Sequence, residues 1–236
     1  MNLHDKVVWI TGSGRGIGEA TAKALAKQGA KVVISARRDE DIGRVTGEIN
    51  ADGDSALAIQ CDVQNNSDIL SLVKQTKDVW GSIDILINNA GIGIFKKILD
   101  LTQEEWDAMM NTNLRSAFLC SKAVLPDMVD RQSGKIINIV SVAGKQAYLN
   151  GGGYCASKFG LRGFTEVLRL EHRRNNIQVT AILPGATDTD IWDGANVDFS
   201  VMMRTEHVSQ AIVSVCTAGD STHIEEVVLR PQGGDL

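Results

Sequence analysis

The chain has 236 residues, of which 43% are hydrophobic and 22% charged, and its formal net charge at pH 7 is -5. This length and balance predict an ordinary globular protein with room for one sizeable α/β domain. The negative charge gives no reason to expect nucleic acid or an anionic membrane as a partner, and no apolar run approaches the roughly 20 residues that span a bilayer.

The cysteines and histidines indicate the redox compartment of the protein and whether it binds a metal. The four cysteines lie far apart and form no C-x-x-C pair, so we expect reduced thiols in a cytoplasmic protein. The four histidines are scattered, which predicts no metal site. The N-terminus lacks the basic and then apolar regions of a signal peptide.

Strand and helix patterns alternate along the chain. Short β-rich or apolar runs predict strands at residues 6–11, 31–36, 56–61, 83–88, 135–141, 177–183 and 225–230. Helical patterns fill the intervals at residues 17–28, 39–51, 67–80, 103–131, 154–175 and 206–218, the fourth of them kinked or broken near Pro126. Nearly continuous apolar strands between helices indicate parallel strands that are buried on both faces.

We therefore predict a Rossmann-like, doubly wound parallel sheet of about seven strands with helices on both faces. No linker, repeat or low-complexity tract divides the chain, so residues 1–236 are expected to form a single domain. Both patterns fade at residues 186–205, directly after the sixth predicted strand. Because ligands of open α/β sheets bind beyond the carboxyl ends of strands, this segment is a candidate substrate-covering loop or, equally, a mobile surface loop.

A glycine-rich turn follows the first predicted strand, with Gly12, Gly16 and Gly18 spaced G-x-x-x-G-x-G rather than G-x-G-x-x-G. Such a turn lets a pyrophosphate approach backbone N–H groups at the start of a helix, where the helix dipole favours anions. Its position between a strand and a helix predicts dinucleotide binding.

The end of the second predicted strand indicates which dinucleotide is bound. An acid there would select NAD through the ribose hydroxyls, but the sequence reads Ser35-Ala36-Arg37-Arg38, with no acid before Asp39. Arg37, together with Arg15, could reach a 2′-phosphate, and hydrogen bonds to charged groups contribute about 1.5–3 kcal/mol each. We expect NADP(H) to be preferred over NAD(H); solvated arginines at a helix start are the alternative.

Tyr154 and Lys158 stand four residues apart in a predicted helix, and therefore on one face of it. A nearby ammonium favours the phenolate, so Lys158 is expected to lower the pKa of Tyr154 from about 10 toward a range where proton exchange works at neutral pH. Taken alone, two such residues are more often exposed residues of a helix without a catalytic role.

Taken together, the motifs resemble the short-chain dehydrogenase/reductase family over nearly the whole chain. The pieces follow the family's order: T-G-x-x-x-G-x-G at residues 11–18, Asp62, Asn88-Asn89-Ala90-Gly91, Asn113, Ser141, Tyr154-x-x-x-Lys158 and Pro184-Gly185. Any one of them is weak evidence, but the ordered set is specific. The members that look most similar are 3-ketoacyl-acyl carrier protein reductases and small carbonyl reductases.

The resemblance implies a catalytic tetrad of Asn113, Ser141, Tyr154 and Lys158. Tyr154 would protonate a carbonyl oxygen as hydride arrives, Ser141 would orient that oxygen, and Lys158 would lower the tyrosine pKa and hold the nicotinamide ribose. Asn113 would position a proton-relaying water; it is preferred to Asn111 because it precedes an apolar residue. A turn residue at Ser141 and a helix-bending residue at Asn113 are the structural alternatives.

The resemblance also implies the cofactor contacts. Asp62 would contact the adenine, and Thr189 of the P-G-x-x-x-T segment would bind the carboxamide. Thr187 stands where many members have an apolar residue, which leaves the local backbone path open. The full expected set is Gly12, Ser13, Arg15, Gly16, Ile17, Gly18, Arg37, Arg38, Asp62, Val63, Asn89, Ala90, Gly91, Tyr154, Lys158, Pro184, Gly185, Thr187 and Thr189.

These motifs favour NADPH-dependent reduction of a small or medium ketone or aldehyde. A 3-ketoacyl-acyl carrier protein reductase is the alternative, supported by possible docking arginines (Arg131, Arg169, Arg173 and Arg174) and opposed by the short 186–205 segment. Four apolar residues of that segment would give the substrate an adaptable lining: Trp192, Phe199, Met202 and Met203. The alternative is that they only anchor the loop.

Two functions from other classes of protein are less well supported by the sequence. A non-catalytic NADP-binding regulatory module would not need the complete tetrad, and a nucleotide-sugar epimerase or dehydratase usually has another glycine spacing and a larger C-terminal region. The resemblance further suggests a homodimer or homotetramer that packs through residues 103–131 and 154–175.

Overall fold

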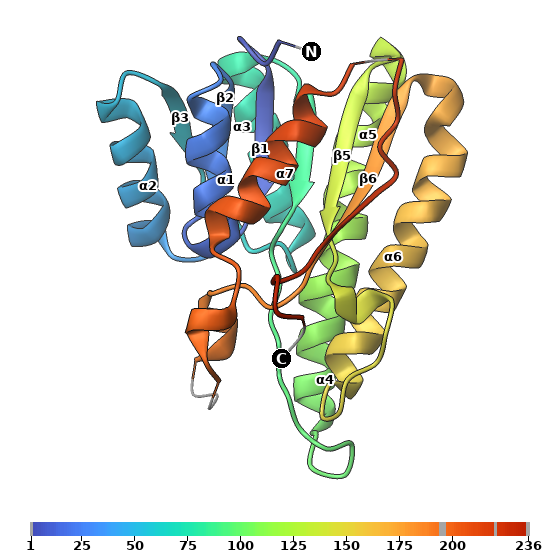
Figure 1. The fold of residues 1–236 in the computed structure, drawn as a ribbon. Coiled ribbons are helices and arrows are strands. Elements are labelled where there is room, and N and C mark those ends of the chain that lie inside the picture. Colours follow the sequence, from blue (N-terminus) through green and yellow to red (C-terminus); the bar gives the residue numbers. More distant parts are fainter. Residues whose placement is uncertain (1, 194–196, 220, 235–236) are drawn as a thin grey trace.

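The computed structural model of the protein describes residues 2–193, 197–219 and 221–234. Its strands are β1 (Val7–Thr11), β2 (Lys31–Ser35), β3 (Ser55–Ala58), β4 (Ile85–Asn88), β5 (Gly134–Ile139), β6 (Ile177–Pro184) and β7 (Glu226–Leu229). They form one all-parallel sheet in the order β3-β2-β1-β4-β5-β6-β7 (Figure 1). The predicted single-domain, doubly wound architecture is confirmed.

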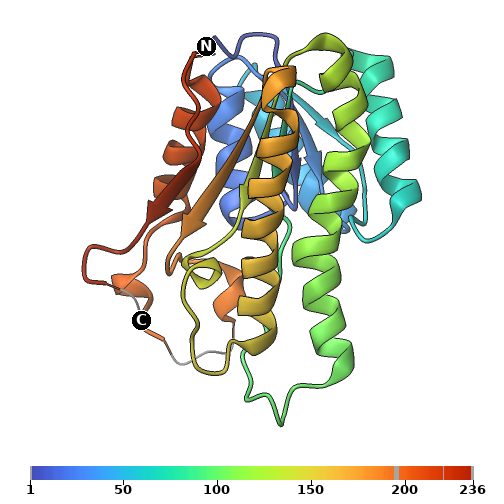
Figure 2. The same cartoon turned by 90° about the vertical axis from the view of Figure 1, so that its right-hand side faces the viewer.

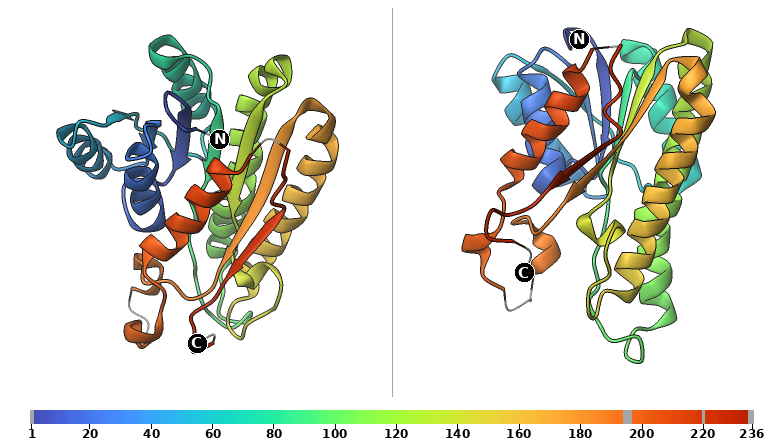
Figure 3. Two further views of the ribbon diagram at one scale, coloured as in Figure 1. Left: turned by 45° about the horizontal axis from the view of Figure 1, so that its top comes forward. Right: turned by 45° about the vertical axis from the view of Figure 1, so that its right-hand side comes forward.

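Helices cover both faces of this sheet, as the side views show (Figures 2 and 3). One layer holds α1 (Gly16–Ala26), α2 (Asp39–Ala51) and α7 (Thr205–Thr217). The other holds α3 (Asn66–Trp80), α4 (Gln103–Met110), α5 (Ser116–Arg131) and α6 (Gly152–His172). Within the described residues, no helix is both long enough and apolar enough to cross a membrane.

Strand β1 shows why the sheet needs two helical layers. Val8 and Ile10 belong to the core beneath α1, α2 and α7, whereas Val7 and Trp9 belong to the core beneath α3 and α5. Successive side chains of a strand point to opposite faces, so an unbroken apolar run buries both faces at once. The indole Nε1 of Trp9 is satisfied by Ser35 Oγ at 2.8 Å.

The functional edge of the sheet follows from the strand order. The chain passes from β1 to β2 on one side and from β4 to β5 on the other, so the connections leaving β1 and β4 diverge. In open α/β sheets this switch point creates a crevice beyond the carboxyl ends of the strands. The loops after β4, β5 and β6 gather at this edge, which is the lower edge in Figure 1.

The long predicted helix at 103–131 is interrupted, but not where the sequence predicted. Helix α5 runs through Pro126 without a break, so the helix is not interrupted at the proline. The interruption is a π turn at Asn111–Arg115, with a bond from Ser116 N–H to the Asn111 carbonyl. A proline inside a helix removes one donor, whereas the π turn changes the helical register and brings Asn113 into the interior, where it is 1% exposed.

The tight crossing of α1 over the glycine turn gives a stability prediction. A Cβ at Gly18 would lie 2.5 Å from the Gly12 carbonyl oxygen and from Asn89 Nδ2. We expect Gly18→Ala to lower the free energy of unfolding by about 1–3 kcal/mol, the usual cost of overpacking. Gly47→Ala, on the exposed side of α2 with nothing within 4 Å, should instead raise it by about 0.5–1 kcal/mol. Urea unfolding of both variants checks this, and equal stability of the two would contradict the account.

Candidate active site

A cleft of about 1010 Å³ opens at the carboxyl edge of the sheet. Its lining comes from the segments that follow β1, β2, β3, β4, β5 and β6, and from the start of α6. Most of the residues proposed from the sequence therefore converge although they lie far apart in the chain. The volume suits an extended organic molecule.

The glycine turn forms one end of the cleft. Gly12 and Gly16 adopt φ values of 64° and 58°, in the left-handed region that favours glycine. A Cβ at Gly12 would also lie 3.0 Å from Ala90 Cα, so the loops after β1 and β4 touch at this point. The turn leads into α1, whose first N–H groups have no carbonyl partners within the helix and attract anions.

Thr11 and Asn89 tie these two loops together. Thr11 Oγ1 accepts the N–H groups of Asn89 and Ala90, both at 2.9 Å. Asn89 Nδ2 donates back to the carbonyl oxygens of Thr11 at 2.9 Å and Gly12 at 3.1 Å. These bonds fix the glycine turn relative to β4.

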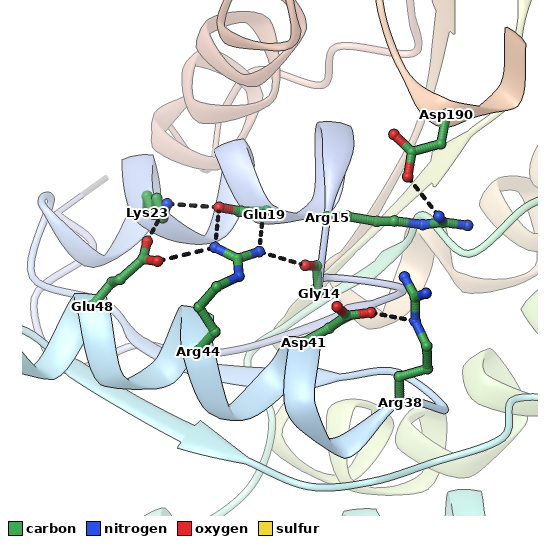
Figure 4. A network of polar contacts seen from close by, with 9 residues as sticks. All are labelled: Gly14, Arg15, Glu19, Lys23, Arg38, Asp41, Arg44, Glu48 and Asp190. Carbon is green, nitrogen blue, oxygen red and sulfur yellow. Dashed lines mark hydrogen bonds and ion pairs between the residues drawn. The ribbon is translucent and has the colours of Figure 1, made fainter. Parts of the chain in front are cut away.

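Charged side chains brace the outer side of the turn (Figure 4). Arg44 of α2 donates to the Gly14 carbonyl at 3.1 Å and to Glu19 of α1 at 2.7 Å. Lys23 joins Glu19 and Glu48, each at 2.6 Å. The hydrogen bond from Arg44 is the largest influence that holds the pKa of Glu19 below its usual value. The network anchors the turn between α1 and α2.

Three arginines stand at the same end of the cleft. Arg15 pairs with Asp190 at 2.5 Å, and Arg38 pairs with Asp41 at 2.5 Å (Figure 4). Arg37 is exposed and lines the cleft, and among the described residues its guanidinium has no ion-pair partner. Two of these arginines are therefore engaged by carboxylates, and Arg37 is the one that can meet an anion directly.

Ser141, Tyr154 and Lys158 meet in the middle of the cleft. The Ser141 side chain hydrogen-bonds Tyr154, and its Oγ also accepts the Ala143 N–H at 3.1 Å, which caps the short 3-10 turn that follows. Lys158 Nζ lies 5.7 Å from the Tyr154 ring centroid and donates to the Ile139 carbonyl at 2.9 Å. Ser141 therefore caps the 3-10 turn and also hydrogen-bonds Tyr154.

The pKa values in this cluster correct one expectation. Burial raises the pKa of Tyr154 to about 12, and the bond from Ser141 offsets only part of this shift. Burial also lowers the pKa of Lys158 to about 8. Removal from water disfavours both charges, so in the protein without cofactor Lys158 does not lower the pKa of Tyr154 toward neutrality. Tyr154 is protonated at pH 7 and can act as a proton donor.

Asn113 lies behind the cleft. Its Oδ1 accepts the Ile92 N–H at 2.8 Å, and its Nδ2 donates to the Ile92 carbonyl and to Ser157 Oγ, both at 2.9 Å. A Cβ at Gly91 would lie 3.3 Å from Asn113 Oδ1 and 3.6 Å from Lys158 Nζ, so the asparagine and the lysine flank this glycine. Asn113 fixes the loop after β4 against α6.

A polar ladder sets α6 against the sheet. Asn88 Nδ2 donates to Asn138 Oδ1 at 2.8 Å across β4 and β5, and Asn138 Nδ2 donates to Thr165 Oγ1 of α6 at 2.8 Å. All three residues are buried, and Asn88 Oδ1 has no hydrogen-bond partner among the described residues. The bonds that are formed join β4, β5 and α6 in one arrangement. The ladder therefore fixes the helix that carries Tyr154 and Lys158.

The segment after β6 folds back over the glycine turn. Thr189 Cγ2 would lie 3.5 Å from a Cβ at Gly16, and Thr187 Oγ1 donates to the Gly185 carbonyl at 3.0 Å. Met203 N–H donates to the Ala186 carbonyl at 3.0 Å and anchors the far end of the segment. Residues 194–196 of the candidate covering loop lie outside the described residues.

Three of the four apolar residues expected to line the substrate region do not line the cleft. Met202 and Met203 are 9% and 7% exposed, and Met203 packs in the core beneath α7. Phe199 is 43% exposed and also lies outside the cleft. Only Trp192 lines it. The two methionines anchor the loop, as the alternative interpretation had it.

The remaining predicted residues fall into those that line the cleft and those that do not. Ser13, Gly18 and Asn113 are absent from the cleft lining: the Ser13 hydroxyl donates to the Ile10 carbonyl at 2.8 Å, and Gly18 supports the turn from beneath. Those that line the cleft are Gly12, Arg15, Gly16, Ile17, Arg37, Arg38, Asp62, Val63, Asn89, Ala90, Gly91, Ser141, Tyr154, Lys158, Pro184, Gly185, Thr187 and Thr189.

Sequence reasoning missed Phe95 and the ion pair between Arg15 and Asp190. Phe95 stacks on Trp192, with ring centroids 5.5 Å apart. No motif or spacing marks Phe95, and its only signal is an aromatic residue in the loop after a central strand. Asp190 directly follows the threonine of the P-G-x-x-x-T segment, but its partner lies 175 residues earlier.

Comparison with known proteins agrees with this geometry. The family described as short chain dehydrogenase matches residues 6–198. The chain is 35% identical to the sepiapterin reductase of Chlorobaculum tepidum over 98% of both chains. A metagenomic short-chain oxidoreductase in complex with NADP has a TM-score of 0.88 at 33% identity, covering 98% of this chain and 99% of that chain. An alcohol dehydrogenase from Thermococcus sibiricus complexed with 5-hydroxy-NADP has a TM-score of 0.90 at 26% identity, with coverages of 96% and 97%.

The chain therefore belongs to the short-chain dehydrogenase family and is an oxidoreductase. The resemblance drawn from the ordered motifs is confirmed.

The bonds of Asn113 give a second prediction. Asn113→Ala leaves both backbone groups of Ile92 without their partner, so we expect a loss of about 1–3 kcal/mol in the free energy of unfolding. Asn111→Ala is the matched control, because no hydrogen bond of the Asn111 side chain occurs among the described residues; it should change stability by less than about 0.5 kcal/mol. Thermal or urea unfolding measures both, and a neutral Asn113→Ala would contradict the positioning role.

Proposed function

We propose that the protein catalyses NADPH-dependent reduction of a ketone or aldehyde, reversibly with oxidation of the alcohol. The observation that carries the proposal is the convergence of Ser141, Tyr154 and Lys158 in one cleft with the glycine turn. A protein that only bound a dinucleotide would not need a half-buried tyrosine with a serine and a lysine at the same point. The non-catalytic module is accordingly the weaker proposal.

The residues of the cleft fit a dinucleotide. Gly12 and Gly16 leave backbone N–H groups open beside the start of α1, and the loops after β3, β4 and β6 complete the binding surface. Asp62 and Val63 would contact the adenine, Asn89, Ala90 and Gly91 would border the cofactor, and Thr187 and Thr189 would reach its carboxamide end. When bound, the nicotinamide supplies the hydride.

Tyr154 carries the proton in this proposal. Its raised pKa keeps the hydroxyl protonated at pH 7, so it can donate to a carbonyl oxygen that gains negative charge. The Ser141 hydroxyl, already bonded to Tyr154, would donate to the same oxygen and orient it. The Lys158 ammonium would stabilise the tyrosinate that remains. Asn113, whose amide is engaged by Ile92 and Ser157, would act indirectly by holding the loop after β4 against α6.

The arginines support NADP(H) over NAD(H). Arg37 reaches the cleft without an ion-pair partner among the described residues, and Arg15 lines the same cleft from the glycine turn, where it pairs with Asp190. Asp41, a carboxylate that lines the cleft near the end of β2, is engaged by Arg38. Two solved structures of similar fold were obtained with NADP or 5-hydroxy-NADP, which agrees with this assignment.

The acyl carrier protein alternative is less well supported. Arg131 pairs with Asp84 at 3.2 Å just before β4, and Arg169 pairs with Glu225 at 3.3 Å just before β7. Both lie at the amino ends of the strands, away from the cleft. Arg173 and Arg174 follow the last turn of α6, more than about 20 Å along the helix from Tyr154 at 1.5 Å per residue. These arginines do not form a docking surface at the cleft mouth.

We further propose that residues 186–205 cover the substrate and that the protein is a cytoplasmic homodimer or homotetramer. The ion pair between Arg15 and Asp190 supports the covering role, because it joins this segment to the glycine turn. Exposed apolar side chains on α5 and α6, namely Phe118, Phe159, Val167 and Leu170, support association through these two helices.

Cofactor choice is testable at Arg37. Loss of one charged hydrogen bond of about 1.5–3 kcal/mol should weaken NADPH binding roughly 10- to 100-fold in Arg37→Ala and leave NADH binding unchanged. Arg174→Ala, an exposed arginine at the far end of α6, is the control and should change neither. Fluorescence titration with both cofactors measures the effect. Equal weakening of NADPH and NADH would contradict the phosphate contact.

The pKa of Lys158 predicts a pH profile. The kcat/KM for NADPH at saturating ketone reports groups of the cofactor-free enzyme, in which the pKa of Lys158 is about 8. The ammonium is lost as pH rises through this value, so reduction should slow between pH 7 and pH 9. Lys158→Met should be slow throughout and lack this limb. A wild-type profile that is flat over the same range would contradict the role of the ammonium.

A further inference from the structure

One wall of the cleft is built from aromatic rings beside Tyr154. Phe95 comes from the loop after β4 and Trp192 from the segment after β6, and both line the cleft. Their ring centroids lie 5.5 Å apart and their planes differ by 4°. The Phe95 ring is also 5.4 Å from the Tyr154 ring, at an interplanar angle of 58°. The stack therefore begins next to the proposed proton donor.

This wall is held in place before any substrate binds. The Trp192 indole Nε1 donates to the Thr187 carbonyl at 3.0 Å, which fixes the ring orientation. At Gly93 a Cβ would lie 2.9 Å from the Phe95 ring and 3.0 Å from Ile191 Cδ1. The missing side chain at Gly93 lets Phe95 and Ile191 approach each other. The stacked rings therefore form a preorganised apolar wall.

Charge around this wall limits the substrate. The three arginines that line the cleft, among the residues that the structure describes, belong to the glycine turn and the end of β2. Among its described residues, the segment that carries Trp192 adds two charged side chains to the lining, Asp190, which pairs with Arg15, and Asp193. Lys158 Nζ is engaged by the Ile139 carbonyl. A substrate carboxylate or phosphate packed on the aromatic wall would therefore lie beside the Asp193 carboxylate, and the nearest cation that lines the cleft, Lys158, is buried behind Tyr154.

We propose that the substrate is an uncharged aryl ketone or aldehyde whose ring packs on the Phe95–Trp192 pair while its carbonyl oxygen meets Tyr154. This inference rests on the proposed function and narrows its substrate class. Aromatic rings in offset-stacked or tilted contact attract each other beyond the gain from buried area. The carbonyl carbon gains a hydride and its oxygen gains a proton, so the aryl ketone leaves as the secondary alcohol and NADPH as NADP⁺.

The test compares two ketones of nearly equal size. Acetophenone and methyl cyclohexyl ketone differ in whether the ring is flat and aromatic. We expect wild-type kcat/KM with NADPH to favour acetophenone by at least about tenfold, and Phe95→Leu or Trp192→Leu each to reduce that ratio roughly two- to tenfold, the size of one aromatic pair. Phe199→Leu, an aromatic of the same segment outside the cleft, should leave the ratio unchanged.

A binding measurement makes the result independent of turnover. Calorimetric titration of both ketones into the NADP⁺-loaded protein should show the same order of affinity and the same loss in the two leucine variants. A ratio near one in wild type, or a ratio that the leucine variants do not change, would overturn the aromatic substrate class. Turnover of methyl cyclohexyl ketone would then still uphold the proposed reductase. Failure to bind NADPH and NADH would remove the reductase proposal, and this inference with it.

Discussion

The hydrogen bonds between Thr11 and Asn89 are the contact on which the site depends. They join the loops after β1 and β4 at the place where the strand order makes those loops diverge. Strands β1 and β4 are themselves paired, and these bonds extend that connection past the strand ends into the two loops. With them, the glycine turn and the loop that carries Ala90 and Gly91 form one surface, and the position of Tyr154 relative to that surface is set by α6.

A second set of hydrogen bonds fixes α6 relative to the sheet. Asn88, Asn138 and Thr165 form a buried ladder from β4 through β5 to the helix, and Asn113 secures the loop after β4 to Ser157 of the same helix. None of these side chains acts on a substrate by itself in this ladder. Their effect is geometric, because a catalytic group must be held within about half an ångström to be effective. Polar residues buried beneath the cleft therefore serve the reaction through the position of Tyr154.

Much of this arrangement could be predicted from the sequence because it depends on local patterns. Apolar runs, turn glycines and motif order identified the parallel sheet and the residues that line most of the cleft. What could not be predicted depends on contacts between distant residues or on competing energies. The π turn at Asn111–Arg115 replaced the break expected at Pro126, and burial outweighed the Lys158 charge in setting the pKa of Tyr154. Phe95 and Trp192 meet only after folding, so their stack has no sequence signal.

The central claim is that this cleft transfers a hydride to a carbonyl carbon with Tyr154 as the proton donor. The most direct measurement is mass spectrometry of the alcohol formed when the protein meets a ketone and NADPH deuterated at the nicotinamide C4 position. The account predicts one deuterium, bound to the carbinol carbon, when the transferred face is labelled and none when the opposite face is labelled. It also predicts product formation at least about 100-fold slower in Tyr154→Phe. Alcohol without deuterium from either labelled cofactor, or undiminished labelling in Tyr154→Phe, would contradict it.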